Sequence, residues 1–214
     1  MILTDVEADA IEARVAEVER RTGAQVVTAL VPRSDDYPEL GWKAFAMGAV
    51  IAALLVVVLD VVYPDWMSSY ALWSNVTPIL GVGAASALLA FALPPYARLY
   101  LNRVRSAGEV RQRAQQMFVE RQLFATHARN GILLMASVFE RRVELLADTG
   151  YRGRIDESEW QRVVGAMTPH LAHARPAEAL LRGLGEIETL LASKGFVAAE
   201  KAVDNELPDR PIET

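Results

Sequence analysis

Two long stretches without charged residues constrain this chain more than any other feature. Residues 44–59 and residues 66–97 contain no Asp, Glu, Lys or Arg. About 20 apolar residues of α-helix cross the roughly 30 Å hydrocarbon core of a bilayer. The sequence therefore predicts a hairpin of two transmembrane helices, with spans at about 44–63 and 76–97. The alternative interpretation is a pair of helices buried in the core of a soluble protein.

Basic residues lie on one side of the predicted hairpin. Lys43 precedes the first span, and five arginines follow the second: Arg98, Arg103, Arg105, Arg111 and Arg113. The connecting residues 64–70 contain no Lys or Arg. Because loops that stay in the cytoplasm are enriched in basic residues, we expect a multi-pass protein of the bacterial inner membrane with both termini in the cytoplasm.

The overall charge and the lack of cysteine narrow the classes of partner and of chemistry. The formal net charge is −5 and the isoelectric point is about 5.3. Such a chain lacks the broad basic surface of nucleic-acid-binding proteins, so we do not expect nucleic acid as a partner. The absence of cysteine excludes disulfides, thiol nucleophiles and thiolate metal sites. The expected partners are the lipid bilayer and another membrane protein.

The residues before the hairpin predict a helix followed directly by a strand. Thr4 and Glu7 have the spacing of a capping box, and Gly23 is a C-terminal stop signal, so we expect a helix over residues 5–22. The short apolar run 25–31 is rich in β-branched residues and predicts a buried strand. A helix joined at once to a strand is typical of an α/β fold.

The residues after the hairpin continue the same alternation. We expect a charged helix over about 106–128, a buried strand over 132–138 and a third strand over 142–147. Asp156 is a suitable N-cap for a following helix, which Pro169 is expected to interrupt, and Pro176 suits the first turn of a last helix. The fold class predicted is α/β. Residues 197–214 are acidic and contain proline, which predicts a disordered tail.

The residues outside the hairpin resemble the TPM domain, a family of membrane-associated α/β/α domains. The order and spacing of several segments carry the resemblance: residues 3–19, 21–27, 130–136, 140–144 and 148–151, and Asp156. The resemblance implies an α/β/α sandwich with a small central sheet. Two departures stand out, since the strand that usually precedes the first helix is missing and the glycine-rich loop from Gly150 to Asp156 is short.

The resemblance also suggests how the chain is divided. It implies that one domain is built from two halves, residues 1–41 and residues 102–196, with the hairpin of residues 42–101 inserted between them. A hairpin returns the chain to the side that it left, so both halves can meet at one face of the membrane. Family members have been associated with acid phosphatase activity, with calcium binding, and with the assembly and repair of membrane complexes.

Carboxylates are the most numerous groups that could carry chemistry. Asp35 and Asp36 follow the first predicted strand, Asp148 follows the third, and Asp156 precedes a helix. If the sheet brings these loops together, their oxygens are suited to Ca²⁺ or Mg²⁺. The alternative is that each aspartate has a local role in a turn or a cap. His170 and His173 are three residues apart but lack the acidic partner and the HExxH pattern of a zinc site.

Two functions are compatible with these features. The first is an integral membrane protein whose cytoplasmic domain is a binding or assembly module. The second is a metal-dependent phosphatase-like hydrolase, in which Arg152 or Arg154 would stabilise the charge of a phosphate ester. A channel or transporter is disfavoured because neither predicted span carries an ionisable residue near its middle.

Overall fold

The chain forms two compact units. The computed structural model describes residues 2–63, 71–198 and 206–213. One unit, the sheet domain, comprises residues 1–35 and 104–214, and the other, the hairpin, comprises residues 36–103. The predicted connecting segment 64–70 and residues 199–205 of the predicted tail lie outside the described residues.

The hairpin contains two long apolar helices. Helix α2 spans Glu39–Val62 and helix α3 spans Ala71–Ala92, followed by the short helices α4 (Pro94–Ala97) and η1 (Arg98–Tyr100). Both long helices are apolar and long enough to cross a membrane, yet only 17% of the most apolar stretch of each is buried. Helices in the core of a soluble protein would be mostly buried, so this exposure disfavours the alternative interpretation.

Small residues allow the two helices to approach closely. Gly48 lies against Ser86, and a Cβ added to Gly48 would come within 2.7 Å of the Ser86 Cβ and 2.9 Å of the Val82 carbonyl oxygen. Ser86 donates a hydrogen bond of 2.7 Å to the carbonyl oxygen of Ala44. Close backbone approach and a side-chain hydrogen bond between helices are the contacts that hold helices together in lipid.

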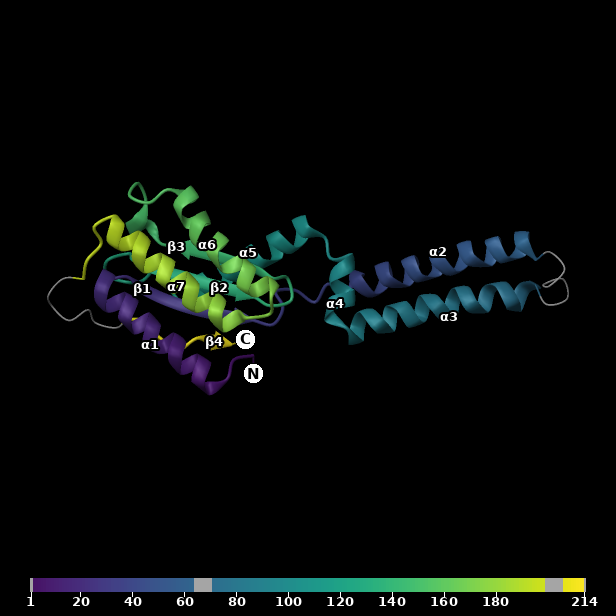
Figure 1. Cartoon of the computed structure of the whole chain (residues 1–214). Coiled ribbons are helices and arrows are strands. Elements are labelled where there is room, and N and C mark those ends of the chain that lie inside the picture. Colours follow the sequence, from purple (N-terminus) through teal and green to yellow (C-terminus); the bar gives the residue numbers. More distant parts are fainter. Residues whose placement is uncertain (1, 64–70, 199–205, 214) are drawn as a thin grey trace. The chain divides into compact units, whose positions relative to one another are not determined.

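The sheet domain has a four-stranded sheet in the order β3-β2-β1-β4 (Figure 1). Its bounds are Gln25–Val31 for β1, Gly131–Ser137 for β2, Arg142–Ala147 for β3 and Ile212–Glu213 for β4. Strands β1 and β2 are parallel and pair along their whole length, with Val27 opposite Leu133. Strand β3 runs antiparallel to β2. Every residue of β1 and β2 is buried, which explains why both segments are almost continuously apolar.

Helices cover both faces of this sheet, which confirms the predicted α/β/α sandwich (Figure 1). One face packs against α1 (Asp5–Thr22), α6 (Glu157–Ala172) and α7 (Pro176–Ser193). The other face packs against α5 (Arg103–Glu120). Alternate residues of β1 serve the two cores, since Val26 and Leu30 face the first and Val27 and Ala29 the second.

The local signals in the N-terminal half are confirmed. The Thr4 side chain accepts from the amide of Glu7, the Glu7 carboxylate accepts from the amide of Thr4, and helix α1 ends at Gly23 in a left-handed conformation. Helix α6 instead continues past Pro169 to Ala172, and α5 ends at Glu120 rather than at about residue 128. Pro169 lies in the last turn of α6, where a lost backbone hydrogen bond costs little.

The expected disorder of residues 197–214 is wrong for the end of the chain. Strand β4 pairs in parallel with Ala29 and Leu30 of β1. The Glu213 carboxylate accepts hydrogen bonds from the amides of Ile2 and Leu3, at 2.8 and 3.0 Å. These contacts join positions about two hundred residues apart in the sequence. Local composition carries no sign of such contacts, so it favoured disorder.

A glycine at the start of β2 is required by a close backbone approach, and this yields a prediction. A Cβ added to Gly131 would overlap the carbonyl oxygen of Leu123, which is main chain and cannot rotate away. We expect Gly131→Ala to lower the free energy of unfolding of the sheet domain by about 3 kcal/mol, the upper end for overpacking. Gly108→Ala in α5 is the control, because its added Cβ meets open space and alanine favours a helix. Urea unfolding in detergent measures both, and equal stability of the two variants would contradict the account.

Candidate functional site

The four predicted aspartates do not form one site, because β3 runs in the opposite direction to β1. Asp35 follows the carboxyl end of β1, beside the last residues of β2. Asp148 follows the carboxyl end of β3, and its amide donates to the carbonyl oxygen of Gly131 at the first residue of β2. Seven strand residues separate these ends by about 20 Å. The loops after β1 and β3 would lie at the same edge of the sheet only if these two strands ran in the same direction.

Each of the other predicted ligands has a separate environment. Asp35 accepts a hydrogen bond of 3.1 Å from Arg105, and Asp36 is exposed in the other compact unit. Asp156 forms a capping box with Glu159 at the start of α6. Within the described ranges, no group of three histidine, aspartate or glutamate side chains is placed to hold a metal ion.

His170, in the last turn of α6, and His173, which caps the end of that helix, also have separate partners. The ring Nδ1 of His170 lies 3.2 Å from the Glu178 carboxylate. The ring Nδ1 of His173 lies 2.8 Å from the carbonyl oxygen of Pro169. The two imidazoles therefore have contacts typical of helix ends and surfaces.

Asp148 is the buried carboxylate of the predicted set. Its side chain is only 4% exposed, and its Oδ2 lies 2.8 Å from Nε of Arg129, which is 49% exposed. The same carboxylate accepts from the amide of Thr149 at 2.7 Å. A cavity of about 210 Å³ opens beside it, lined on its polar side by Asp148, Thr149, Tyr151, Arg152 and Glu157. A buried carboxylate and an exposed arginine thus lie next to an accessible cavity.

The loop before β2 holds this cavity in place through Asn130. The carbonyl oxygen of Asn130 accepts from the Tyr151 hydroxyl at 2.8 Å and from the amide of Gln25 at 3.1 Å. Its side-chain amide donates to the carbonyl oxygen of Gly23 at 2.6 Å. Gly150 donates to the carbonyl oxygen of Arg129, and an added Cβ there would lie only 2.5 Å from that oxygen. The loops after α1, before β2 and after β3 are therefore fixed to one another.

A second cavity of about 310 Å³ lies next to the first. It is lined by all six residues of β3, by Arg111 of α5, and by residues of α6. Both cavities are lined by Ala147, Glu157 and Trp160, so they are neighbours, and we call the two together the β3 groove. The groove runs along β3, an edge strand of the sheet, between α5 and α6.

The β3 groove contains charges of both signs. Burial raises the pKa of Glu144, and the positive charge of Arg111, whose Nε is 3.9 Å away, opposes this effect. The nearby carboxylate of Glu157 raises the same pKa further. The side chain of Arg111 remains 64% exposed. The groove therefore offers an exposed cation beside a partly buried carboxylate.

Comparison with known proteins agrees with this architecture. Residues 98–190, which include α5, β2, β3 and α6, match the family model described as the TPM domain. Over these residues the chain is similar to the TPM domain. An NMR structure of the BA42 protein from the psychrophilic bacterium Bizionia argentinensis is similar, with a TM-score of 0.58 and 14% identity. The match covers 99% of this chain and 95% of that one, and at this identity it shows the fold alone. No curated protein matches.

The β3 groove lies within the matched region, and sequence reasoning missed it. Arg111 entered only the predictions of topology and of a charged helix, and Arg142 and Glu144 entered only the prediction of a third strand. One signal was available, since the polar residues of 142–147 suggest a strand that is not central. The groove itself depends on the positions of α5 and α6 beside that strand. A local sequence pattern does not predict these positions.

Glu19 is a second buried carboxylate near the same end of the sheet. It lies in the last turn of α1, is 5% exposed, and accepts a hydrogen bond of 2.7 Å from the amide of Val26. Burial raises the pKa of Glu19 to about 7, the hydrogen bond from Val26 opposes the shift, and the charge of Asp209 adds to it. Burial also raises the pKa of Tyr151, with smaller contributions from Asp148 and Glu19.

The raised pKa of Glu19 predicts a pH-dependent stability. Between its unfolded value of 4.5 and about 7, the folded state binds more protons than the unfolded state, so stability falls as pH rises through this window. We expect Glu19→Gln to be more stable than the natural protein by about 2 kcal/mol at pH 8 and equal to it at pH 4.5.

The same unfolding series contains its own control. Glu120→Gln removes an exposed carboxylate at the end of α5 and is expected to change stability little at either pH. Urea unfolding at the two pH values measures both variants. A Glu19→Gln variant that is less stable than the natural protein at pH 8 would contradict the account.

Proposed function

We propose that this chain is an integral protein of the bacterial inner membrane, with both termini in the cytoplasm, whose TPM domain is a binding or assembly module for another membrane protein. The observation that carries the proposal is the exposed apolar surface of α2 and α3. Large side chains such as Leu54, Val61 and Phe91 are 65%, 75% and 76% exposed. Contiguous apolar surface of this extent is suited to lipid and not to water.

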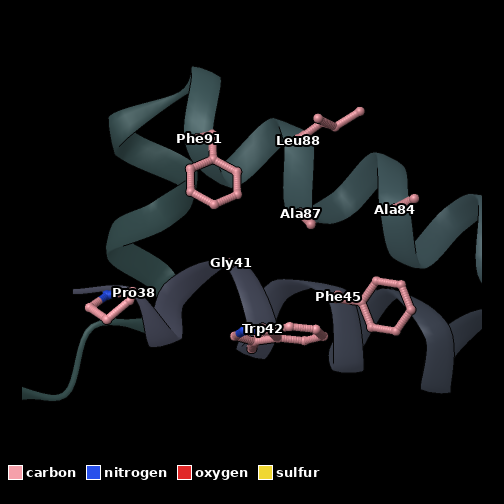
Figure 2. Close-up of a pocket in the computed structure, with 8 residues that line it drawn as sticks. All are labelled: Pro38, Gly41, Trp42, Phe45, Ala84, Ala87, Leu88 and Phe91. Carbon is pink, nitrogen blue, oxygen red and sulfur yellow. The ribbon is translucent and has the colours of Figure 1, made fainter. Parts of the chain in front are cut away.

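A groove in the hairpin supports the membrane part of the proposal. It has a volume of about 500 Å³ and is lined by Pro38, Gly41, Trp42, Phe45, Ala84, Ala87, Leu88 and Phe91. Figure 2 shows the rings of Trp42 and Phe45 on α2 and of Phe91 on α3 around it. Trp42 and Lys43 lie near the start of α2, where tryptophan and lysine are common at a membrane surface. Deeper along α2, residues 44–59 carry no charge.

The β3 groove supports the binding part of the proposal. It combines apolar wall residues, such as Trp160 and Val164, with the charges of Arg111 and Glu144. A depression with apolar walls and a few placed polar groups is the usual form of a binding site.

One observation favours the second candidate, a metal-dependent phosphatase-like hydrolase. Asp148 is buried beside the 210 Å³ cavity, with the cations Arg129 and Arg152 close to it. A carboxylate and arginines are groups that phosphoryl transfer uses. However, Asp148 is already paired with Arg129 and caps the turn that begins at Thr149. We therefore give preference to a structural role for Asp148.

Membrane insertion is tested by placing charge on the hairpin. We expect the double variant Leu54→Arg and Val58→Arg to lose carbonate-resistant membrane association, because each arginine costs about 3 kcal/mol at the centre of a transmembrane helix. Val6→Arg is the control, since Val6 is also apolar and exposed but lies on α1. A reporter fused after Thr214 is expected to give a cytoplasmic signal. A periplasmic signal, or membrane association unchanged by the two arginines, would contradict the proposal.

The choice between the two functions is tested by turnover. We expect the purified protein in lipid nanodiscs to hydrolyse p-nitrophenyl phosphate no faster in Mg²⁺ or Ca²⁺ than in chelator. Asp148→Ala and the control Asp36→Ala are then compared. Metal-dependent hydrolysis that Asp148→Ala removes and Asp36→Ala leaves intact would decide for the hydrolase and against the binding module.

A further inference from the structure

Strand β3 is an edge strand whose backbone faces the groove. It is the last strand in the order β3-β2-β1-β4, and no other strand in the described part of the chain lies on its outer side. In an antiparallel pair, alternate residues direct both backbone polar groups to the partner strand. The amide of Asp148 donates to the carbonyl oxygen of Gly131, so the backbone polar groups of Asp148 point toward β2. By alternation, the backbone groups of Val143, Leu145 and Ala147 point outward.

The outward backbone groups open into a depression with two walls. All three residues line the β3 groove, together with Arg111 of α5 on one side and Trp160 and Val164 of α6 on the other. Exposed strand edges pair readily with another extended chain, so proteins usually cover or interrupt them. Here the edge lies at the floor of a groove, where a single extended segment has access.

We propose that the β3 groove binds an extended peptide segment of a partner protein, which adds a strand to β3. This inference rests on the proposed binding function and names the chemistry of its partner. The outward N–H and C=O groups of Val143, Leu145 and Ala147 supply the main-chain hydrogen bonds of strand addition. A second copy of this chain fits less well, because its own β3 is likewise recessed between α5 and α6.

The groove walls set a preference for alternate side chains of the bound segment. Successive side chains of a strand point to opposite faces of the sheet. On one face they meet Trp160 and Val164, which suit apolar residues. On the other they meet the exposed guanidinium of Arg111, which suits an acidic residue. The bound segment is therefore expected to alternate apolar residues with polar ones, including an acidic residue opposite Arg111.

The test uses a displayed library of random 12-residue peptides selected on the intact protein in lipid nanodiscs. Each selected peptide is synthesised as a series of variants, and each variant carries one N-methylated backbone nitrogen. Strand addition predicts that affinity falls about tenfold for methylation at every second residue within the bound stretch and changes little at the residues between, because only alternate N–H groups pair with β3. The intervening positions serve as matched controls within each peptide.

A variant of the groove wall gives the second readout. Arg111 is exposed, so Arg111→Glu leaves the fold intact and is expected to weaken acidic peptides about tenfold. Arg121→Glu is the control, because it makes the same change at an exposed position beyond the end of α5. Library selection on Arg111→Glu is expected to return basic residues at the position where the natural protein selects acidic ones.

Several outcomes would overturn the inference. These are a selection that returns no binding peptide, N-methylation effects without a period of two, and binding that is equal for Arg111→Glu and Arg121→Glu. Each would leave the membrane anchor untouched, because insertion is measured separately by carbonate extraction. A protein that leaves the membrane fraction would instead contradict the proposed function, whatever its peptide binding.

Discussion

The parallel pairing of β1 with β2 is the contact on which the sheet domain depends. Seven residue pairs, from Gln25 with Gly131 to Val31 with Ser137, join the part of the chain before the hairpin to the part after it. Strand β3 pairs with β2, and β4 pairs with β1, so the central pair joins both outer strands into one sheet. Residues 32–130, which include the hairpin, separate the paired strands in sequence. The entropic cost of closing a longer loop grows only slowly with its length, so an inserted hairpin is compatible with one shared core.

The two edges of the sheet differ, and this difference bears on function. At one edge β4 pairs with Ala29 and Leu30, and the Glu213 carboxylate fixes it to the first residues of the chain. At the other edge β3 faces a groove with charges and aromatic residues. A covered edge stabilises the domain, whereas an accessible edge offers main-chain hydrogen bonds to a partner. The open edge belongs to the segment that matches the TPM domain.

Local signals in the sequence were sufficient for most of the fold. The Thr4 and Glu7 capping box, the Gly23 stop and the apolar runs of β1 and β2 depend on neighbouring residues, and they predicted these elements within one residue. The direction of β3 depends on its pairing with β2, and this direction separates Asp148 from Asp35. Strand β4 depends on contacts between the two ends of the chain. The predicted aspartate cluster, the disordered tail and the unpredicted groove therefore share one cause, which is long-range geometry.

The central claim is that one sheet forms from strands that precede and follow the apolar hairpin in the sequence. Nuclear Overhauser contacts in the intact protein in lipid nanodiscs test it most directly, with selective labelling of Val27 and Leu133, which lie opposite each other in the core. The account predicts a contact between these two residues, and between Ala29 and Met135 two positions further along. Absence of both contacts in a protein that is folded and embedded in lipid would contradict it.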